Sequence, residues 1–152
     1  MAGMKTLPKE GMEVLSNDDC EQLLGSSSLG RLALVVNGEP EVFPVNYAFA
    51  EGVVVFRTAL GLKLEKAPLT KVAFEVDRVD TAHGIAWSVV VKGTAYDIST
   101  PGDHLPERLR RLAVHPQAPG AGKAWMAIHA DSVTGRRFGL PPVGKTPWLH
   151  LQ

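Results

Sequence analysis

Cysteine is scarce in this sequence, which contains one thiol, Cys20, in 152 residues. A single cysteine excludes an intramolecular disulfide and a metal site built from several thiolates. It also fits a reducing compartment. We therefore expect a cytoplasmic protein in which Cys20 is a half-buried residue of a helix.

The chain also lacks an excess of charge and any long apolar run. Its 16 basic residues balance its 16 acidic residues, which argues against a broad nucleic-acid surface or a polybasic membrane contact. No apolar stretch approaches the roughly 20 residues that span a bilayer, and the first residues contain no signal-peptide core. We expect neither a nucleic-acid partner nor a membrane partner.

Common catalytic motifs are missing as well. The sequence has no G-x-S-x-G, H-E-x-x-H, C-x-x-C, Walker loop or G-x-G-x-x-G, which lowers the hydrolase, metalloenzyme, kinase and Rossmann interpretations. The histidines are scattered singly, so we expect no metal site, and no catalytic residue can be identified. They are His83, His104, His115, His129 and His150.

What the sequence does contain is a series of short strands. Apolar residues alternate over 29–36 and again over 41–50, and Asn37-Gly38 between them is a strong hairpin signal. Further strands are expected at 53–56, 71–77 and 85–98, the last bent at Gly93. Residues 124–128 and 133–138 form either one strand or a pair.

Helices are fewer and shorter. Ser16 can cap a helix that ends at Gly25, a short helix follows the strand 53–56 and ends at Ala67-Pro68, and leucines at helical spacing predict another helix within 101–115. Six or seven strands with two or three short helices predict a mainly β protein, a small antiparallel β-barrel with peripheral helices.

The length and composition indicate one folded domain. We expect an N-terminal arm at 1–15, the domain at 16–138, and a proline-rich C-terminal tail at 139–152. Trp148 in that polar tail suggests that the tail docks on a surface. The strands are apolar on more faces than one small core can bury, which predicts a homodimer.

One stretch combines groups that bind phosphate. The apolar strand 53–56 leads directly into Arg57 and Thr58, and Lys63 follows after a flexible glycine, Gly61. A guanidinium, a hydroxyl, an ammonium and the N–H groups of a helix start can together hold an anion. The alternative, equally open from these residues alone, is that Arg57 and Lys63 are solvated charges.

Six short segments, taken together, resemble the pyridoxamine 5′-phosphate oxidase-like family. The resemblance is greatest to its small bacterial branch, which includes nitroimidazole-resistance flavoproteins, and extends from about Leu15 to Phe138. The segments are Gly30-Arg31-Leu32-Ala33, Pro44-Val45-Asn46-Tyr47, Val55-Phe56-Arg57-Thr58 with Gly61-x-Lys63, Phe74-Glu75-Val76-Asp77, Trp87-Ser88-Val89-Val90-Val91-x-Gly93 and Thr134-Gly135-Arg136-Arg137.

This resemblance implies an FMN-binding split β-barrel that dimerises, with two equivalent cofactor sites at the interface. By the same resemblance, the phosphate role goes to Arg57, Thr58 and Lys63. The flavin ring would lie against Val45 and Asn46, with Trp87 and Ser88 near it, and Arg136 would reach the cofactor of the other subunit.

The chain departs from the oxidase that gives the family its name. That enzyme has two adjacent basic residues for the phosphate, whereas here Lys63 is followed by Leu64. No counterpart of its vitamin-phosphate clamp is found either. We therefore expect an FMN-dependent oxidoreductase that acts on a small electrophile of the quinone or nitro type, and not on pyridoxamine phosphate.

Two alternatives remain open at this stage. The protein could use the deazaflavin coenzyme of related split barrels, although that coenzyme's long acidic tail calls for a wider basic groove. It could also be a flavin-binding or sensory module without turnover. The visible spectrum of the purified protein discriminates among them, because it separates FMN from deazaflavin and both from no cofactor.

Overall fold

The computed structural model describes residues 11–58, 70–98 and 124–140, which form seven strands and one helix. Their order confirms a mainly β fold. The elements are β1 (Met12–Val14), α1 (Asn17–Ser26), β2 (Leu29–Val36), β3 (Glu39–Ala50), β4 (Val53–Thr58), β5 (Thr70–Asp80), β6 (Ile85–Asp97) and β7 (Ala124–Gly139).

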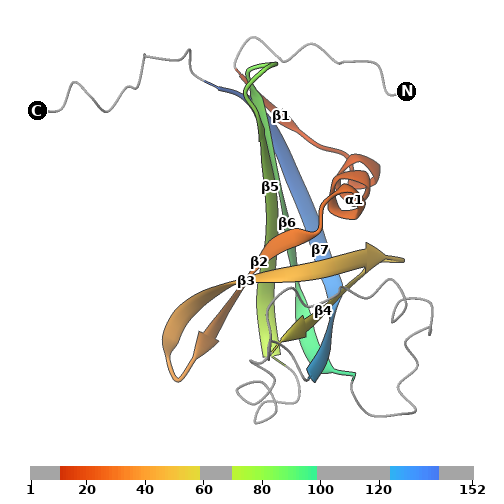
Figure 1. Ribbon diagram of the computed structural model, residues 1–152, viewed down its shortest axis with the longest axis vertical. Helices are drawn as coiled ribbons and strands as arrows, with labels where there is room; N and C mark the ends of the chain where they lie inside the picture. The colour runs from red at the N-terminus through yellow and green to blue at the C-terminus, as the bar shows by residue number, and fades with distance from the viewer. Residues whose placement is uncertain (1–10, 59–69, 99–123, 141–152) are drawn as a thin grey trace, which may run out of the picture.

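All strand pairs are antiparallel, and the sheet closes on itself. Strand order is β1-β7-β4-β3-β2-β5-β6, with an additional pairing between β7 and β6 that completes the ring. β6 pairs with one edge of β7 along most of its length. On the other edge, β4 pairs with the first part of β7 and β1 with the last part. Figure 1 shows β5, β6 and β7 running together along the long axis, with the β2–β3 hairpin projecting from them. This is the expected split β-barrel.

Local sequence signals explain the first elements. The Ser16 hydroxyl accepts a hydrogen bond from the N–H of Asp19 at 3.2 Å and so caps α1. Asn37 and Gly38 both adopt positive φ, at 52° and 80°, which is the backbone of a tight two-residue hairpin between β2 and β3. Both expectations are confirmed.

The structure also decides points that the sequence left open. Residues 124–139 form one continuous strand, β7, and not a pair. Residues 12–14, expected in an arm, form β1, which pairs with the end of β7. A register shift between Lys92 and Gly93 marks the expected bend in β6. The helices expected after strand 53–56 and within 101–115 lie outside the described residues.

The barrel interior holds the main core. Its fully buried side chains include Phe56, Phe74 and Val89. The helix α1 packs against β3, β6 and β7 and adds Leu24 and Cys20 to this core. Burial raises the pKa of the Cys20 thiol, with the nearby carboxylates as the smaller cause. Cys20, expected to be half-buried, is instead fully buried in the core.

Candidate functional site

Two residues assigned to the cofactor, Asn46 and Arg57, lie where β3 and β4 part. The ladder between these strands ends at the Tyr47–Phe56 pair, and Asn46 and Arg57 are each one position beyond it. Because side chains alternate along a strand and Tyr47 and Phe56 point into the core, Asn46 and Arg57 both face outward. Both are half-buried.

Arg57 has an aromatic neighbour and one buried nitrogen atom without a partner. Its guanidinium carbon lies 5.4 Å from the centre of the Trp125 ring, on the neighbouring strand β7. Its Nε atom is buried and has no hydrogen-bond partner. A buried donor without a partner is costly, so an acceptor supplied by a ligand would be stabilising here. Arg57 thus fits the phosphate of a flavin.

Ser88 and Arg136 form a second group. They are directly paired on β6 and β7, and they face outward, with Ser88 half-buried and Arg136 exposed. Asp77 is paired with Ser88 on the other side, in β5. This end of the barrel therefore carries a hydroxyl, a guanidinium and a carboxylate in one row across three strands.

The two groups are far apart within one chain. Arg57 is paired with Trp125 near the start of β7, whereas Arg136 is 11 positions further along the same strand. At 3.2–3.4 Å per residue, these positions are separated by roughly 35 Å of strand. One phosphate group cannot contact Arg57 and Arg136 of the same chain.

Val45 and Trp87, which the resemblance places at the flavin ring, point inward. Each is 7% exposed and belongs to the main core. Their neighbours Asn46 and Ser88 occupy the outer face, as strand alternation requires. The side chains available to a ligand on the outer face are therefore those of Asn46 and Ser88.

The structure describes the remaining two predicted phosphate ligands only in part. Thr58 is the last residue of β4 and is paired with Ala124, but its side chain lies outside the described residues. Lys63 lies outside them entirely. The roles assigned to both residues stay predictions.

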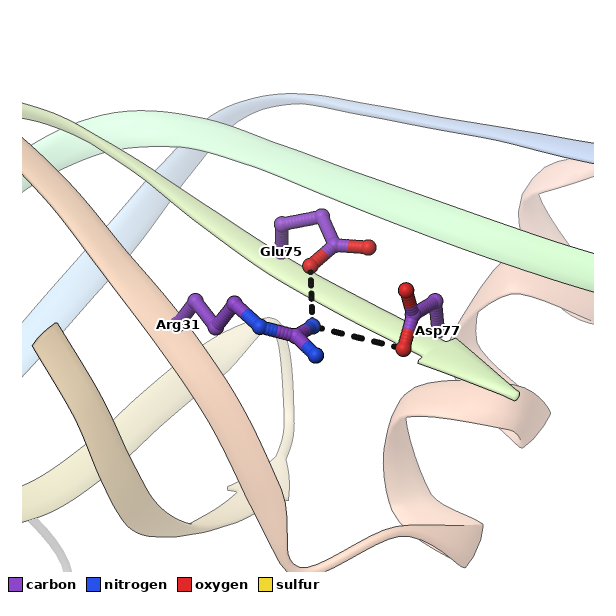
Figure 2. Close-up of polar contacts among 3 residues, drawn as sticks. All are labelled: Arg31, Glu75 and Asp77. Atoms are coloured by element: carbon purple, nitrogen blue, oxygen red, sulfur yellow. Dashed lines mark hydrogen bonds and ion pairs between the residues drawn. The ribbon is translucent and has the colours of Figure 1, made fainter. Parts of the chain in front are cut away.

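Sequence reasoning gave no role to two arginines that border a cavity of about 360 Å³. Arg31 donates from Nη1 to Glu75 at 2.9 Å and to Asp77 at 3.3 Å, as Figure 2 shows. These carboxylates raise the pKa of the Arg31 guanidinium, with the hydrogen bond to Glu75 as the largest cause. Arg78 lies over the ring of Trp87 at 5.6 Å.

No linear motif marks this cavity, because the residues around it come from α1, β2, β3 and β5. Arg78 meets Trp87 only through the β5–β6 register, which pairs the two residues directly. Sequence reasoning could have found this pair by counting residues outward from the turn after Asp80, because that count places Arg78 opposite Trp87.

Within ranges 11–58, 70–98 and 124–140, no cluster of three or more histidine, cysteine or acidic side chains could hold a metal ion. In the same part of the chain, no helix combines the length and the apolar character needed to cross a bilayer.

Comparison with known proteins shows which family this barrel resembles. Residues 16–137 match the profile of the family described as pyridoxamine 5′-phosphate oxidase. The uncharacterized protein Rv0080 of Mycobacterium tuberculosis is 34% identical over 139 residues, which cover 86% of this chain and 90% of that protein.

Two solved structures are similar over most of their length. One is the FAD binding protein from Mycobacterium smegmatis, with 33% identity, a TM-score of 0.68, and coverage of 84% of this chain and 98% of that one. The other is a candidate pyridoxamine 5′-phosphate oxidase from Corynebacterium glutamicum, with 33% identity, a TM-score of 0.72, and coverage of 85% and 99%.

Proposed function

Because the chain belongs to the pyridoxamine 5′-phosphate oxidase family, we propose that it binds FMN and acts as an oxidoreductase on a small electrophile of the quinone or nitro type. The observation that carries the proposal is Arg57, whose buried Nε has no hydrogen-bond partner. A flavin phosphate supplies the acceptor oxygens that this donor lacks.

The residues of the chain have separate tasks in this proposal. Arg57, with Thr58 and Lys63, binds the phosphate. Asn46, on the neighbouring strand β3, would hold the ring, because its side-chain amide can hydrogen-bond the polar edge of a flavin.

Bound flavin would supply the transfer of electrons to the substrate, so no acid–base triad is needed from the protein. The protein's contribution is to hold the ring and to admit the substrate beside it. Ser88 offers a hydroxyl on the outer face, which can donate a hydrogen bond to the ring or to a substrate oxygen. Reduced nicotinamide is the proposed electron donor.

The proposed site needs a second copy of the chain. Arg57 and Arg136 cannot reach one cofactor within a single chain, since roughly 35 Å of strand separates them. In a two-fold symmetric dimer, Arg57 and Asn46 of one subunit can face Ser88 and Arg136 of the other, and the same arrangement then occurs twice.

An exposed apolar face supports dimerisation. Val35 and Val42, on the outer side of the β2–β3 hairpin, are 63% and 62% exposed. They border a groove of about 620 Å³ together with Ala33 and Ala73. Exposed apolar surface of this kind is typical of interfaces between subunits, and we propose that a second copy of this chain covers it.

FAD is the second candidate cofactor, because the Mycobacterium smegmatis protein that is 33% identical over most of its length is described as FAD binding. FMN and FAD share the isoalloxazine ring and the first phosphate, so Arg57 fits either. A deazaflavin coenzyme, and a flavin-binding module without turnover, are the remaining alternatives.

The test is a titration of cofactor-free protein with FMN, FAD and the deazaflavin coenzyme, followed by absorbance and by light scattering. We expect saturation at one FMN per chain, a dimeric mass, and reoxidation of the reduced flavin by a quinone or nitro compound. Absence of saturable binding by any of the three would remove the cofactor proposal. Tight flavin binding without reoxidation by either compound would favour the alternative of a flavin-binding module without turnover.

A further inference from the structure

The cavity of about 360 Å³ next to α1 exists because β2 and β5 separate there. Their ladder covers only three pairs, from Arg31–Glu75 to Ala33–Ala73. Beyond Arg31, the chain of β2 leaves β5 and continues into the serine linker at the end of α1. The cavity lies in this gap, with Leu29 and Pro44 as its apolar wall.

The linker and β5 provide the polar wall. Arg78 is exposed, and its Nη2 donates to the carbonyl oxygen of Ser26 at 3.3 Å and to the hydroxyl of Ser27 at 3.4 Å. Both distances are longer than a strong N–H···O bond. The guanidinium carbon of Arg78 lies over the Trp87 ring, 5.6 Å from its centre, a cation–π contact that favours this position of the side chain.

Arg78 is also the less neutralised of the two arginines. Arg31 is shared between Glu75 and Asp77, which Figure 2 shows on one side of its guanidinium. Among the described residues, no carboxylate forms an ion pair with Arg78. The cavity therefore has a positively charged planar donor, Arg78, at one end and a carboxylate, that of Asp77, nearby.

We propose that this cavity binds a small molecule with an apolar body and a single planar carboxylate, which Arg78 holds. A guanidinium fork matches a planar carboxylate with two parallel hydrogen bonds. A dianion such as phosphate is disfavoured because the Asp77 carboxylate lines the same space. The volume is near the lower end of the roughly 300–1,000 Å³ range of ligand pockets, which suits a molecule of the size of benzoate.

The position of the cavity suggests what the bound acid is for. Leu29 is paired with Asn46, and Asp77 is paired with Ser88. In the proposed dimer, Asn46 and Ser88 of one chain border different flavin rings. The cavity, through Asp77 and Arg78 on β5, therefore adjoins the ring at Ser88 on the neighbouring strand. A carboxylate held by Arg78 would anchor an acidic substrate beside that ring. This use as an anchor rests on the proposed function, whereas binding of the acid does not.

The experiment measures binding to the full chain from which flavin has been removed. Benzoate, the neutral isostere benzamide and inorganic phosphate are titrated separately, and the indole N–H signal of Trp87 is followed by NMR after assignment with Trp87→Phe. We expect a saturable shift with benzoate and binding at least about ten-fold weaker for benzamide and for phosphate. Equal affinity for benzoate and benzamide would overturn the proposal, as would tighter binding of phosphate.

Variants provide the second arm. Arg78→Gln should weaken benzoate binding at least about ten-fold, and Arg78→Lys by an intermediate factor because the charge remains but the fork is lost. Lys92→Gln removes one positive charge from an exposed position of β6 and should bind benzoate as the unmodified chain does. If Lys92→Gln and Arg78→Gln weakened benzoate binding equally, the effect would be one of net charge alone, and the proposed site would be refuted.

Asp77→Asn keeps the test decisive even if Arg78→Gln fails to fold. Removing this carboxylate from the cavity should strengthen benzoate binding several-fold, since a like charge is lost. Unchanged or weaker binding would contradict the proposal. Because flavin is absent throughout, these outcomes are independent of whether the protein binds FMN.

Discussion

The guanidinium of Arg57 lies over the ring of Trp125, 5.4 Å from its centre, although 68 positions separate the two residues in the chain. The β4–β7 ladder pairs them directly. A cation–π contact with an indole favours this position of the guanidinium, and the strand restricts its backbone. Arg57 is therefore a pre-positioned donor, unlike a lysine or arginine on a surface loop.

Replacing Arg57 by Lys tests whether this geometry matters. The charge is kept, but a lysine cannot reproduce the planar fork or the stacking on Trp125. Loss of a charge-assisted bond amounts to about 1.5–3 kcal/mol, so we expect FMN affinity to fall by about ten-fold to over a hundred-fold. The measurement is an FMN titration of Arg57→Lys protein, with its melting temperature as the folding control. Unchanged FMN affinity together with an unchanged melting temperature would show that Arg57 does not bind the phosphate.

Lys63 and Lys66 form a matched pair for a second test, although both lie outside the described residues. By the family resemblance, Lys63 binds the phosphate, whereas the resemblance assigns no role to Lys66. We expect Lys63→Ala to weaken FMN binding by about ten-fold or more, whereas Lys66→Ala should change it little. Equal dissociation constants for the two variants would show that the phosphate lies elsewhere.

The shared site can be tested by mixing two defective chains. Arg57→Ala and Arg136→Ala homodimers should each bind FMN weakly. In a purified heterodimer of the two, one site combines both substitutions and the other site contains neither, if the arginines come from different subunits. We therefore expect one site per heterodimer with unmodified affinity. If both arginines served a site from the same subunit, every site in the heterodimer would be defective.

Gly30 tests the packing between β2 and the core. A Cβ atom built at this position would lie 2.2 Å from Cζ of Phe74, which is fully buried. Gly30→Ala should therefore destabilise the protein by about 1–3 kcal/mol and lower the melting temperature by several degrees. Gly25→Ala is the control, because apart from its chain neighbours and its own helix backbone no described atom lies within 4 Å of the added Cβ; equal melting temperatures for the two variants would contradict this account.

Tyr47 joins β3 to α1 by donating a hydrogen bond to the carbonyl oxygen of Leu24 at 2.5 Å. Burial is the main cause that raises its pKa from 10.0 to about 12. Because the folded protein disfavours the tyrosinate, stability is retained below pH 10 and is lost as the pH rises from about 10 to about 12.

Tyr47→Phe should thus destabilise the protein at neutral pH, by about 1–3 kcal/mol, since the Leu24 carbonyl loses its partner. It should also lose less stability than the unmodified chain at alkaline pH. Urea unfolding of both proteins at a series of pH values measures this, and titration of Cys20 affects both equally. Parallel stability curves above pH 10 would show that Tyr47 does not titrate as stated.

Much of the fold could be predicted from local signals. Alternating apolar residues, the Asn37-Gly38 turn and the Ser16 cap each act through neighbouring backbone groups, so a linear pattern is enough to identify them. The short β1 could not be identified in this way. It forms through a backbone ladder with the far end of β7, where Glu13 lies opposite Arg137, 124 positions away, and accepts a hydrogen bond from it at 2.5 Å. Three residues alone show no periodicity.

The sequence by itself determined which chemical groups this protein has and where its strands and turns occur, because these depend on side-chain type and spacing. The tertiary structure alone decided which groups meet. The β4–β7 ladder places Arg57 over Trp125, and the β5–β6 ladder places Arg78 over Trp87, yet Trp125 and Arg136 lie near opposite ends of β7. Such distances follow from strand register, which is set by the summed packing of the whole core and is not encoded in any short motif.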